Sequence, residues 1–248
     1  AKIRITPTFK NGKDQPQTGY CGVTEVIDKD VNVKINTSTN FIKWLAITRL
    51  PFTSASFLPI IVVAAYFSFV GDNLFNMSAL IFSLLGVIFA HLSVNVFNDY
   101  FDNLDGTDEK NTEYFQQLSG GSRAIELGLI SLSKTKTLAH VLCLIAIIFG
   151  VLTLLSSNSS NYFEIFLIAK AALSLGYFYT APPFRLVSRK GLGELTIFLT
   201  FGPLLTLGVA FAIFNGDLMS SEHFVNCLLL GVPMGLLTTN ILLINQFP

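Results

Sequence analysis

Charged residues and cysteines are scarce in this chain of 248 residues. Only 13% of the residues are charged, about half the share of roughly 25% that is usual in soluble domains. The formal net charge is zero, which argues against a nucleic-acid partner, because such a partner requires a basic field. The cysteines stand far apart, at Cys21, Cys143 and Cys227. This spacing predicts neither a disulfide framework nor a cysteine metal site.

Long apolar runs take the place of the missing charge. About 20 apolar residues, with a rise of about 1.5 Å each, cross a hydrocarbon core of about 30 Å. Several runs in this chain are apolar all round, without the polar stripe of a soluble helix. Six segments satisfy the length, at roughly 46–70, 79–98, 137–156, 161–181, 193–214 and 223–244. The sequence therefore predicts an all-α, polytopic membrane helix bundle embedded in a lipid bilayer.

Residues 1–42 differ from the rest of the chain because they are polar and comparatively basic. Short alternating stretches at 2–5 and 31–35 give a weak signal for strands. We interpret this region as a polar cytoplasmic N-terminal arm rather than as a small folded domain. The membrane domain is then expected to cover residues 43–248.

Basic residues alternate between the loops of the predicted bundle. The loops at 71–78, 157–160 and 215–222 contain no Lys or Arg, whereas those at 99–136 and 182–192 contain several. Lys and Arg near helix ends are retained on the cytoplasmic side of a membrane. The alternation therefore predicts a cytoplasmic N-terminus, with both basic loops on that same side.

A polar cluster closes the second apolar segment. Four of its residues have offsets of 0, 4, 7 and 11, which share one helical face: His91, Asn95, Asn98 and Asp102. A polar stripe inside a membrane must face protein or water. Gly106 permits a turn that returns Asp108 to the side of Asp102. Because carboxylate and amide oxygens are ligands that Mg²⁺ accepts, we interpret Asn98, Asp102 and Asp108 as a magnesium site.

The alternative for these acidic residues is a solvated loop that caps the helix end. We assign that role to Asp99 and Asp105, and we expect Asp99→Ala to have a mild effect because Asp99 points away from the face of Asp102. His91 fits a hydrogen-bonded interior residue better than a ligand. Lys170 lies in the middle of the fourth segment, and its role is left open. We expect it to face the bundle interior or a polar partner, because a side chain at the midplane does not readily reach the interface.

A glycine-rich segment follows in the same loop as the acidic cluster. Residues 118–123 read Leu-Ser-Gly-Gly-Ser-Arg. Backbone N–H groups, the Ser122 hydroxyl and the Arg123 guanidinium can all bind a phosphate oxygen. This segment is a weak signal by itself, and it gains meaning from the carboxylates beside it.

A second loop on the same side offers further cations. The fourth segment is expected to stop near Ala181, because Pro182 cannot continue a helix. Arg185 and Lys190 then follow before the next apolar run. Contact with substrate and positive-inside topology explain these two cations equally well.

Together these residues resemble the first aspartate-rich motif of UbiA-type prenyltransferases. The resemblance is carried by the run 98–102 with Gly106 and Asp108. The six-residue step from Asp102 to Asp108 is similar to that of the menaquinone branch, the 1,4-dihydroxy-2-naphthoate polyprenyltransferases. The segments 119–123, 179–183 and 191–194 resemble the same branch more than the chlorophyll, haem or 4-hydroxybenzoate branches. The resemblance covers roughly residues 44–248.

This resemblance implies a bundle of nine membrane helices around a central cavity. It implies that a polyprenyl diphosphate is held through Mg²⁺ by two aspartate-rich motifs. The expected reaction moves the polyprenyl group to an aromatic acceptor such as 1,4-dihydroxy-2-naphthoate, as in menaquinone biosynthesis. The expected location is a bacterial inner membrane.

The resemblance also assigns roles to residues of this chain. Asn98, Asp102 and Asp108 would hold the metal, and Asp102 and Asp108 would thereby be catalytic. Tyr179 would face the developing allyl cation, which an aromatic ring stabilises. Substrate contacts are expected from the hydroxyl, guanidinium and ammonium groups of the two loops, namely Ser122, Arg123, Arg185 and Lys190.

The chain departs from the family pattern at residues 245–248, where the second motif would begin. With six helices of an expected nine, we expect an incomplete domain that does not turn over by itself. A non-catalytic UbiA-like subunit of a larger membrane assembly would tolerate such a loss. An enzyme of the chlorophyll branch is a further alternative. A transporter is a third, although its polar residues would usually lie near the midplane rather than at one helix end.

Overall fold

The computed structural model describes residues 4–8, 19–23, 44–45, 47–70, 75–105, 122, 124–125 and 129–245. The chain divides into two compact units, Ala1–Phe41 and Ile42–Pro248. In the first unit, strand β1 (Arg4–Thr8) pairs antiparallel with β2 (Gly19–Val23). The strand signal at 2–5 overlaps β1, β2 was not predicted, and the signal at 31–35 lies outside the described residues.

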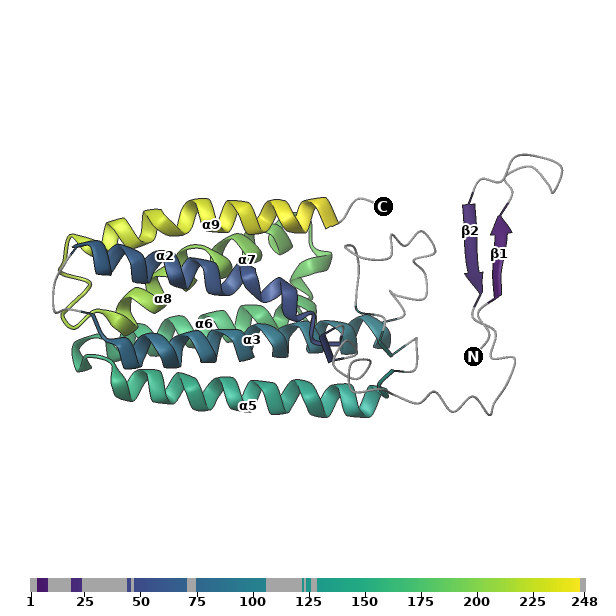
Figure 1. Ribbon diagram of the computed structural model, residues 1–248, viewed down its shortest axis with the longest axis horizontal. Coiled ribbons are helices and arrows are strands. Elements are labelled where there is room, and N and C mark those ends of the chain that lie inside the picture. Colours follow the sequence, from purple (N-terminus) through teal and green to yellow (C-terminus); the bar gives the residue numbers. More distant parts are fainter. Residues whose placement is uncertain are drawn as a thin grey trace. The chain divides into compact units, whose positions relative to one another are not determined.

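The second unit is a bundle of helices that run along a common direction (Figure 1). Within the described part of the chain, six spans are long and apolar enough to cross a membrane. They overlap all six predicted segments, so the prediction of an all-α membrane bundle is confirmed for this unit. Its helices are α2 (Ser54–Val70), α3 (Met77–Leu104), α5 (Leu132–Ser156), α6 (Tyr162–Thr180), α7 (Leu192–Phe201), α8 (Pro203–Ile213) and α9 (His223–Asn245).

Helix α3 is the element that positions the acidic cluster. Its 28 residues extend about 42 Å, which exceeds a hydrocarbon core of about 30 Å. Asn76 caps the N-terminus by accepting a hydrogen bond from the Ala79 N–H at 3.0 Å. The side chain of Asn76 also donates to Ser156 O, and its backbone N–H donates to Ile213 O. Because these bonds hold the start of α3 level with the ends of α5 and α8, the excess length lies at the other end, where the carboxylates are.

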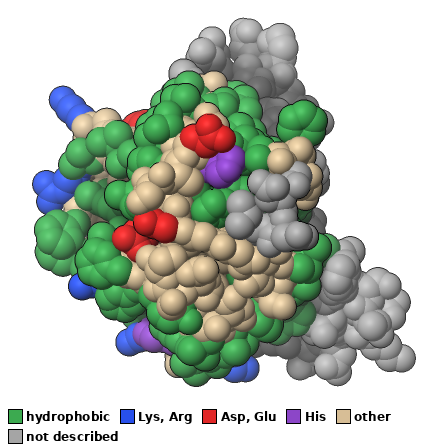
Figure 2. Space-filling view, turned by 90° about the vertical axis from the view of Figure 1, so that its left-hand side faces the viewer, with side chains coloured by type: hydrophobic (Ala, Val, Ile, Leu, Met, Phe, Trp, Pro, Cys, Tyr) green, Lys and Arg blue, Asp and Glu red, His purple; other side chains and the backbone are tan. Residues whose placement is uncertain are grey.

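The bundle thus has two ends of different composition. We call the end that holds the C-termini of α3 and α6 the site end. The opposite end, formed by residues 75–76, 156–162 and 214–223, is the distal end. Figure 2 looks onto the distal end and shows mainly apolar and uncharged polar atoms, with a few acidic side chains and a histidine among them and Lys and Arg only at the edge of the view.

Two groups of buried apolar side chains fill the space between the helices. One group lies toward the distal end and includes Val63, Phe67 and Phe211. The other lies toward the site end and includes Val96 and Phe97. The second group packs against α3 next to its acidic end.

The fifth span is two helices, which corrects the continuous segment predicted at 193–214. α7 and α8 are separated by Gly202, whose φ is −103° and ψ −108°. Pro203 has no N–H to donate to the preceding turn, which favours a break at this point. A Cβ added to Gly202 would lie 2.5 Å from Gly231 O and 2.9 Å from the Cα of Gly235. The break therefore sits directly against two glycines of α9, as in close packing of membrane helices through small residues.

Candidate active site

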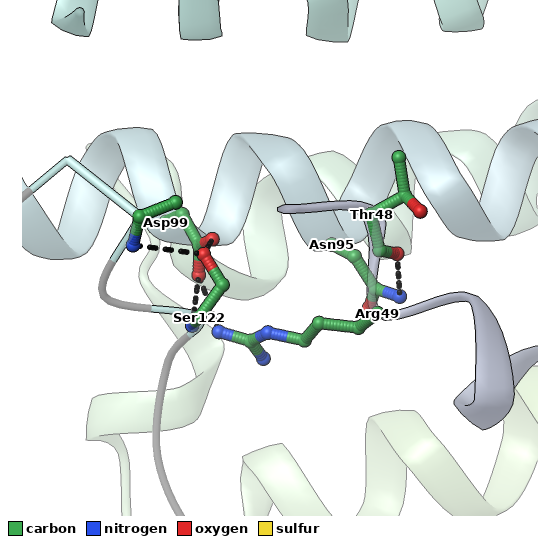
Figure 3. Close-up of polar contacts among 6 residues, drawn as sticks. Thr48, Arg49, Asn95, Asp99 and Ser122 are labelled. Atoms are coloured by element: carbon green, nitrogen blue, oxygen red, sulfur yellow. Dashed lines mark hydrogen bonds and ion pairs between the residues drawn. The ribbon is translucent and has the colours of Figure 1, made fainter. Parts of the chain in front are cut away.

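The polar face of α3 contacts α2 and the segment that leads into it. His91 Nδ1 lies 2.6 Å from Ser56 Oγ. Asn95 Nδ2 donates to Thr48 O at 3.2 Å, as Figure 3 shows. This part of the stripe therefore faces protein, as expected for polar groups at membrane depth. The expectation that His91 is a hydrogen-bonded interior residue is confirmed.

Asp99 is buried and ion-paired, so the interpretation of this residue as solvated is wrong. It is 4% exposed. Its Oδ1 accepts from the Arg49 guanidinium and, at 3.1 Å, from the Ser122 N–H. Its Oδ2 accepts from the Ser122 hydroxyl (Figure 3). Removing one partner of a buried pair of this kind typically costs about 3–5 kcal/mol of stability, because a charge is left without compensation.

Arg185 reaches the same helix end from the loop after α6. That helix ends at Thr180, as the prolines predicted. One guanidinium nitrogen of Arg185 lies 2.6 Å from Asp105 Oδ2, and another lies 3.9 Å from Asp102 Oδ1. Asp105 is thus an ion-pair partner and not only a solvated residue. Arg185 and Arg49, the two arginines paired with α3, both have left-handed backbones, with φ of 41° and 51°. Non-glycine residues hold this conformation at a cost of about 1–2 kcal/mol, so their surroundings must enforce it.

Oxygen ligands for a cation are present at the site end. The Asn98 amide oxygen is buried without a hydrogen-bond partner, and Asp102 follows one turn later on the same face. Both groups fit Mg²⁺, which binds through carboxylate and amide oxygens. The third predicted ligand, Asp108, lies outside the described residues. Among the residues that the structure describes, no group of three His, Cys, Asp or Glu side chains could hold a metal.

Tyr179 lies beside the same site. It is 7% exposed, and its hydroxyl is buried without a partner. The carboxylates of Asp102 and Glu194 are close enough for their charges to act on this hydroxyl. The structure therefore brings Tyr179 and the first turn of α7 to the acidic end of α3.

The remaining predicted site residues differ in their placement. Lys190 is exposed, and no hydrogen bond or ion pair to it occurs among the described residues. Ser122 is at the site end, but its hydroxyl is engaged by Asp99. Arg123 lies outside the described residues.

The sequence did not predict two residues at the site, Arg49 and Glu194. Arg49 pairs with Asp99 although 50 positions separate them, so no local pattern indicates the contact. The available signal was a charge inside the apolar segment predicted at 46–70, since such a charge must find a partner. Glu194 was noted only as the end of a motif.

The position of Lys170 differs from the prediction. It was expected to face the bundle interior or a polar partner, but it is exposed on α6 and has no hydrogen bond or ion pair among the described residues. The buried residues of α6 are Ile165, Tyr179 and Thr180, which lie on other sides of the helix or at its end. Position within an apolar run does not show which side of a helix is covered.

These features define a class: an integral membrane protein with oxygen ligands and guanidinium groups gathered at one end of its helices. A family model described as the UbiA prenyltransferase family matches residues 56–248, and the chain belongs to this family. The family resemblance expected from residues 98–108 is thereby confirmed.

Two curated relatives are both 2-carboxy-1,4-naphthoquinone phytyltransferases. The chain is 34% identical over 180 residues to the chloroplastic 2-carboxy-1,4-naphthoquinone phytyltransferase of Arabidopsis thaliana, a match that covers 73% of this chain and 42% of that protein. It is 30% identical over 205 residues to the 2-carboxy-1,4-naphthoquinone phytyltransferase of Synechocystis sp., covering 82% and 60%. The chain thus spans less than two thirds of the length of either relative. No solved structure matches it.

Proposed function

We propose that the protein carrying this chain transfers a polyprenyl group from an allylic diphosphate to a naphthoquinone-type aromatic acceptor, such as 1,4-dihydroxy-2-naphthoate. The observation that carries the proposal is the buried, unpartnered amide oxygen of Asn98 beside Asp102, at the end of a helix that belongs to the UbiA family match. The two relatives, both naphthoquinone phytyltransferases, favour the naphthoquinone branch over the chlorophyll branch.

In this proposal Asn98, Asp102 and Asp108 hold Mg²⁺. A bound Mg²⁺ would neutralise the charge that grows on the departing diphosphate. Arg185 lies 3.9 Å from Asp102. Its guanidinium would therefore be within reach of a diphosphate bound through a metal at Asp102. The further candidates for phosphate contacts in this proposal are those that the sequence predicted, Ser122, Arg123 and Lys190.

The reaction breaks the bond between the allylic carbon and the diphosphate oxygen, and the electron pair leaves with the diphosphate. A ring carbon of the acceptor then forms the new carbon–carbon bond and afterwards loses its proton or carboxyl group. Tyr179 offers an aromatic ring beside Asp102, and a ring face stabilises positive charge. The apolar side chains beneath the site, including Val96 and Phe97, exclude water that would otherwise capture the cation.

The proposal places the site end on the cytoplasmic side, with residues 1–42 as a polar arm on that side. It is supported by the loops, since only those at 99–136 and 182–192 carry Lys and Arg. Location in a bacterial inner membrane stays a prediction, because one of the two relatives is a chloroplastic protein. Thiol labelling of single cysteines tests the orientation. Residues within 71–78 should be reached only from outside, and labelling of them from the cytoplasm alone would reverse the assignment.

The reaction is tested with the full-length protein in detergent. It is incubated with Mg²⁺, an allylic polyprenyl diphosphate and 1,4-dihydroxy-2-naphthoate, and the product is identified by mass spectrometry. We expect a prenylated 1,4-dihydroxynaphthalene, the quinol form, that disappears when the metal is chelated and returns when Mg²⁺ is restored. Absence of transfer to any naphthoate or quinone acceptor would instead favour a non-catalytic subunit.

A further inference from the structure

Tyr179 carries a buried hydroxyl that the bundle leaves without a hydrogen-bond partner. The residue is 7% exposed, and no described residue bonds its hydroxyl oxygen. A buried phenol hydroxyl usually finds a partner, because leaving it unpaired costs about 1–3 kcal/mol. The proposed role opposite the allyl cation uses the ring of Tyr179 and not this hydroxyl. The hydroxyl can therefore serve a ligand that enters the site.

Two carboxylates lie close to this hydroxyl. The charges of Glu194 and Asp102 both act on it, although neither carboxylate is hydrogen-bonded to it. Asp102 belongs to the proposed metal site in α3, whereas Glu194 is in the first turn of α7. Glu194 is half-buried, and the proposed metal and phosphate contacts do not use it.

The backbone holds Glu194 at the site end. A Cβ added to Gly193, the residue before it, would lie 3.2 Å from the Cα of Val187, so glycine permits a close approach here. The first turn of α7 therefore packs directly on the 3₁₀ turn η3 (Leu186–Ser188). The residue before this turn is Arg185, which pairs with the acidic end of α3.

The cations of the loop before α7 do not neutralise Glu194. Arg185 pairs with the acidic end of α3, and Arg189 Nε donates to Phe184 O at 2.7 Å. No ion pair to Lys190 occurs among the described residues. Within the described part of the chain, Glu194 likewise has neither a hydrogen bond nor an ion pair, so its carboxylate keeps its capacity to accept a proton.

We propose that Tyr179 and Glu194 form the subsite for a hydroxyl group of the aromatic acceptor, with Glu194 as the general base. The Tyr179 hydroxyl donates to the acceptor oxygen, and the Glu194 carboxylate takes the proton of that oxygen. Because Asp102 acts on the same tyrosine from the metal side, the diphosphate and the acceptor would meet at Tyr179. This inference rests on the proposed function and adds to it the residues that recognise the acceptor.

The proton transfer activates the ring carbon that attacks. Loss of the hydroxyl proton to Glu194 raises the electron density on the neighbouring ring carbon. That carbon forms the bond to the allylic carbon while the diphosphate leaves with its electron pair. The ring carbon then loses its carboxyl group as CO₂, or its proton to water, and the electron pair left behind restores the aromatic ring. The acceptor oxygen recovers its proton from Glu194.

The decisive variant is Glu194→Gln, which keeps the shape of the side chain and removes the base. We expect kcat to fall about 100-fold, in the range of general-base catalysis, with both KM values and the binding of Mn²⁺ within about threefold. Tyr179→Phe keeps the ring and removes only the hydroxyl. It should raise the KM for the acceptor about tenfold and leave the KM for the polyprenyl diphosphate within about twofold.

A modified acceptor tests the proton transfer directly. Each monomethyl ether of 1,4-dihydroxy-2-naphthoate blocks one hydroxyl, and one of the two ethers blocks the hydroxyl that Glu194 deprotonates. That ether should lower the kcat of the unmodified protein about 100-fold, but the kcat of Glu194→Gln less than about threefold, since the base and its proton form one contact. A structural role of Glu194 predicts the same loss in both proteins.

The chain offers a matched control at the start of α6. Glu164 is the third residue of α6, as Glu194 is of α7, and neither helix has a side-chain hydrogen bond at its N-cap. One oxygen of Glu164 is also buried without a partner. Glu164→Gln should leave kcat and both KM values unchanged. It thereby separates a catalytic base from the favourable effect of a carboxylate near a helix N-terminus.

The outcomes are distinct from those of the proposed function. If the unmodified protein forms no prenylated product, the proposed function fails. Binding of 1,4-dihydroxy-2-naphthoate, measured by a change in its fluorescence, then still decides the subsite, because Tyr179→Phe should weaken it about tenfold. Unchanged binding in that variant would overturn the subsite.

If the unmodified protein does form product, the kinetics of the variants decide the role of Glu194. A kcat of Glu194→Gln within about threefold of the unmodified protein, or equal losses of both proteins with each ether, would overturn it. Should Glu194→Gln not fold, Glu194→Asp takes its place. It keeps a carboxylate on a shorter side chain, so its kcat should fall about tenfold and the blocking ether should still lower it further.

Discussion

The two ends of the bundle are closed by different chemistry. At the distal end, the fully buried Asn161 donates to the carbonyls of Phe211, Phe214 and Gly216 and accepts from the Leu218 N–H at 2.8–3.3 Å. At the site end, the helix ends are held together by ion pairs, of Arg49 with Asp99 in α3 and of Arg185 with Asp105, the residue that follows α3.

The difference shows which end can exchange partners. The side-chain amide of Asn161 is hydrogen-bonded to backbone groups through both its N–H₂ group and its oxygen, so it has no free donor or acceptor for a ligand. A guanidinium–carboxylate pair can separate when a metal and a diphosphate arrive, because the cation takes the carboxylate and the anion takes the guanidinium. Under the proposed function, the distal end only closes the bundle, whereas at the site end the pair of Arg185 with the acidic end of α3 can exchange its partners.

The largest effect is expected from breaking the site end at Asp102. Asp102→Ala should reduce prenyl transfer about 1000-fold, or about 4 kcal/mol of barrier, because few ligands hold the metal. Insertion and Tm should stay close to those of the unmodified protein. Rates are measured by product formation under saturating Mg²⁺. A loss smaller than about threefold would remove Asp102 from the site.

Breaking the distal end should instead affect stability. Asn161→Leu has a similar volume but leaves several buried carbonyls and one N–H without partners, which we expect to lower the free energy of unfolding by about 3 kcal/mol. Titration with a denaturing detergent measures this change. The kcat of the protein that remains folded should not change, and a fall in kcat at unchanged stability would contradict the division between the two ends.

An intermediate effect is expected when the exchangeable pair is weakened. Arg185→Gln removes the cation that lies 2.6 Å from Asp105, so Mn²⁺ binding without substrate should tighten about threefold, as for a partly exposed pair. The KM for the diphosphate should rise about tenfold, because a phosphate contact is lost. Changes of both quantities in the same direction would show that Arg185 does not exchange between carboxylates and diphosphate.

The smallest effect is expected at a carboxylate of the distal end. Asp217→Asn should change the free energy of unfolding by less than about 0.5 kcal/mol, since Asp217 is exposed and, among the described residues, bonds only Ser220. Thermal unfolding measures this value. A large loss of activity in this variant would mean that the distal end takes part in the reaction.

Local signals in the sequence were sufficient for the spans and for part of the site. Apolar runs predict helices because each membrane helix satisfies its own hydrogen bonds. The spacing of Asn98 and Asp102 predicts a shared face, because residues four positions apart lie on the same side of a helix. Pro182 predicts where α6 stops. These features depend on residues within one or two turns of one another.

Features that depend on distant segments were not predictable in this way. The burial of Asp99 depends on Arg49 and Ser122, which are 50 and 23 positions away in the sequence. Gly202 looked like one more residue of an apolar run, although the glycine–proline pair was a signal for the break. The exposure of Lys170 follows from which side of α6 is covered, which the content of its own helix does not determine.

The length of α3 has a consequence for the lipid that surrounds the protein. Asn76 ties the start of the helix to the distal end, so the position of Asn98 and Asp102 relative to the headgroups depends on the thickness of the bilayer. With a rise of about 1.5 Å per residue, a bilayer thicker by about 5 Å would bring one more turn into the hydrocarbon. Hydrophobic mismatch of this kind is relieved by tilting or by local thinning. Acyl-chain length therefore becomes a variable that sets how well the carboxylates are hydrated.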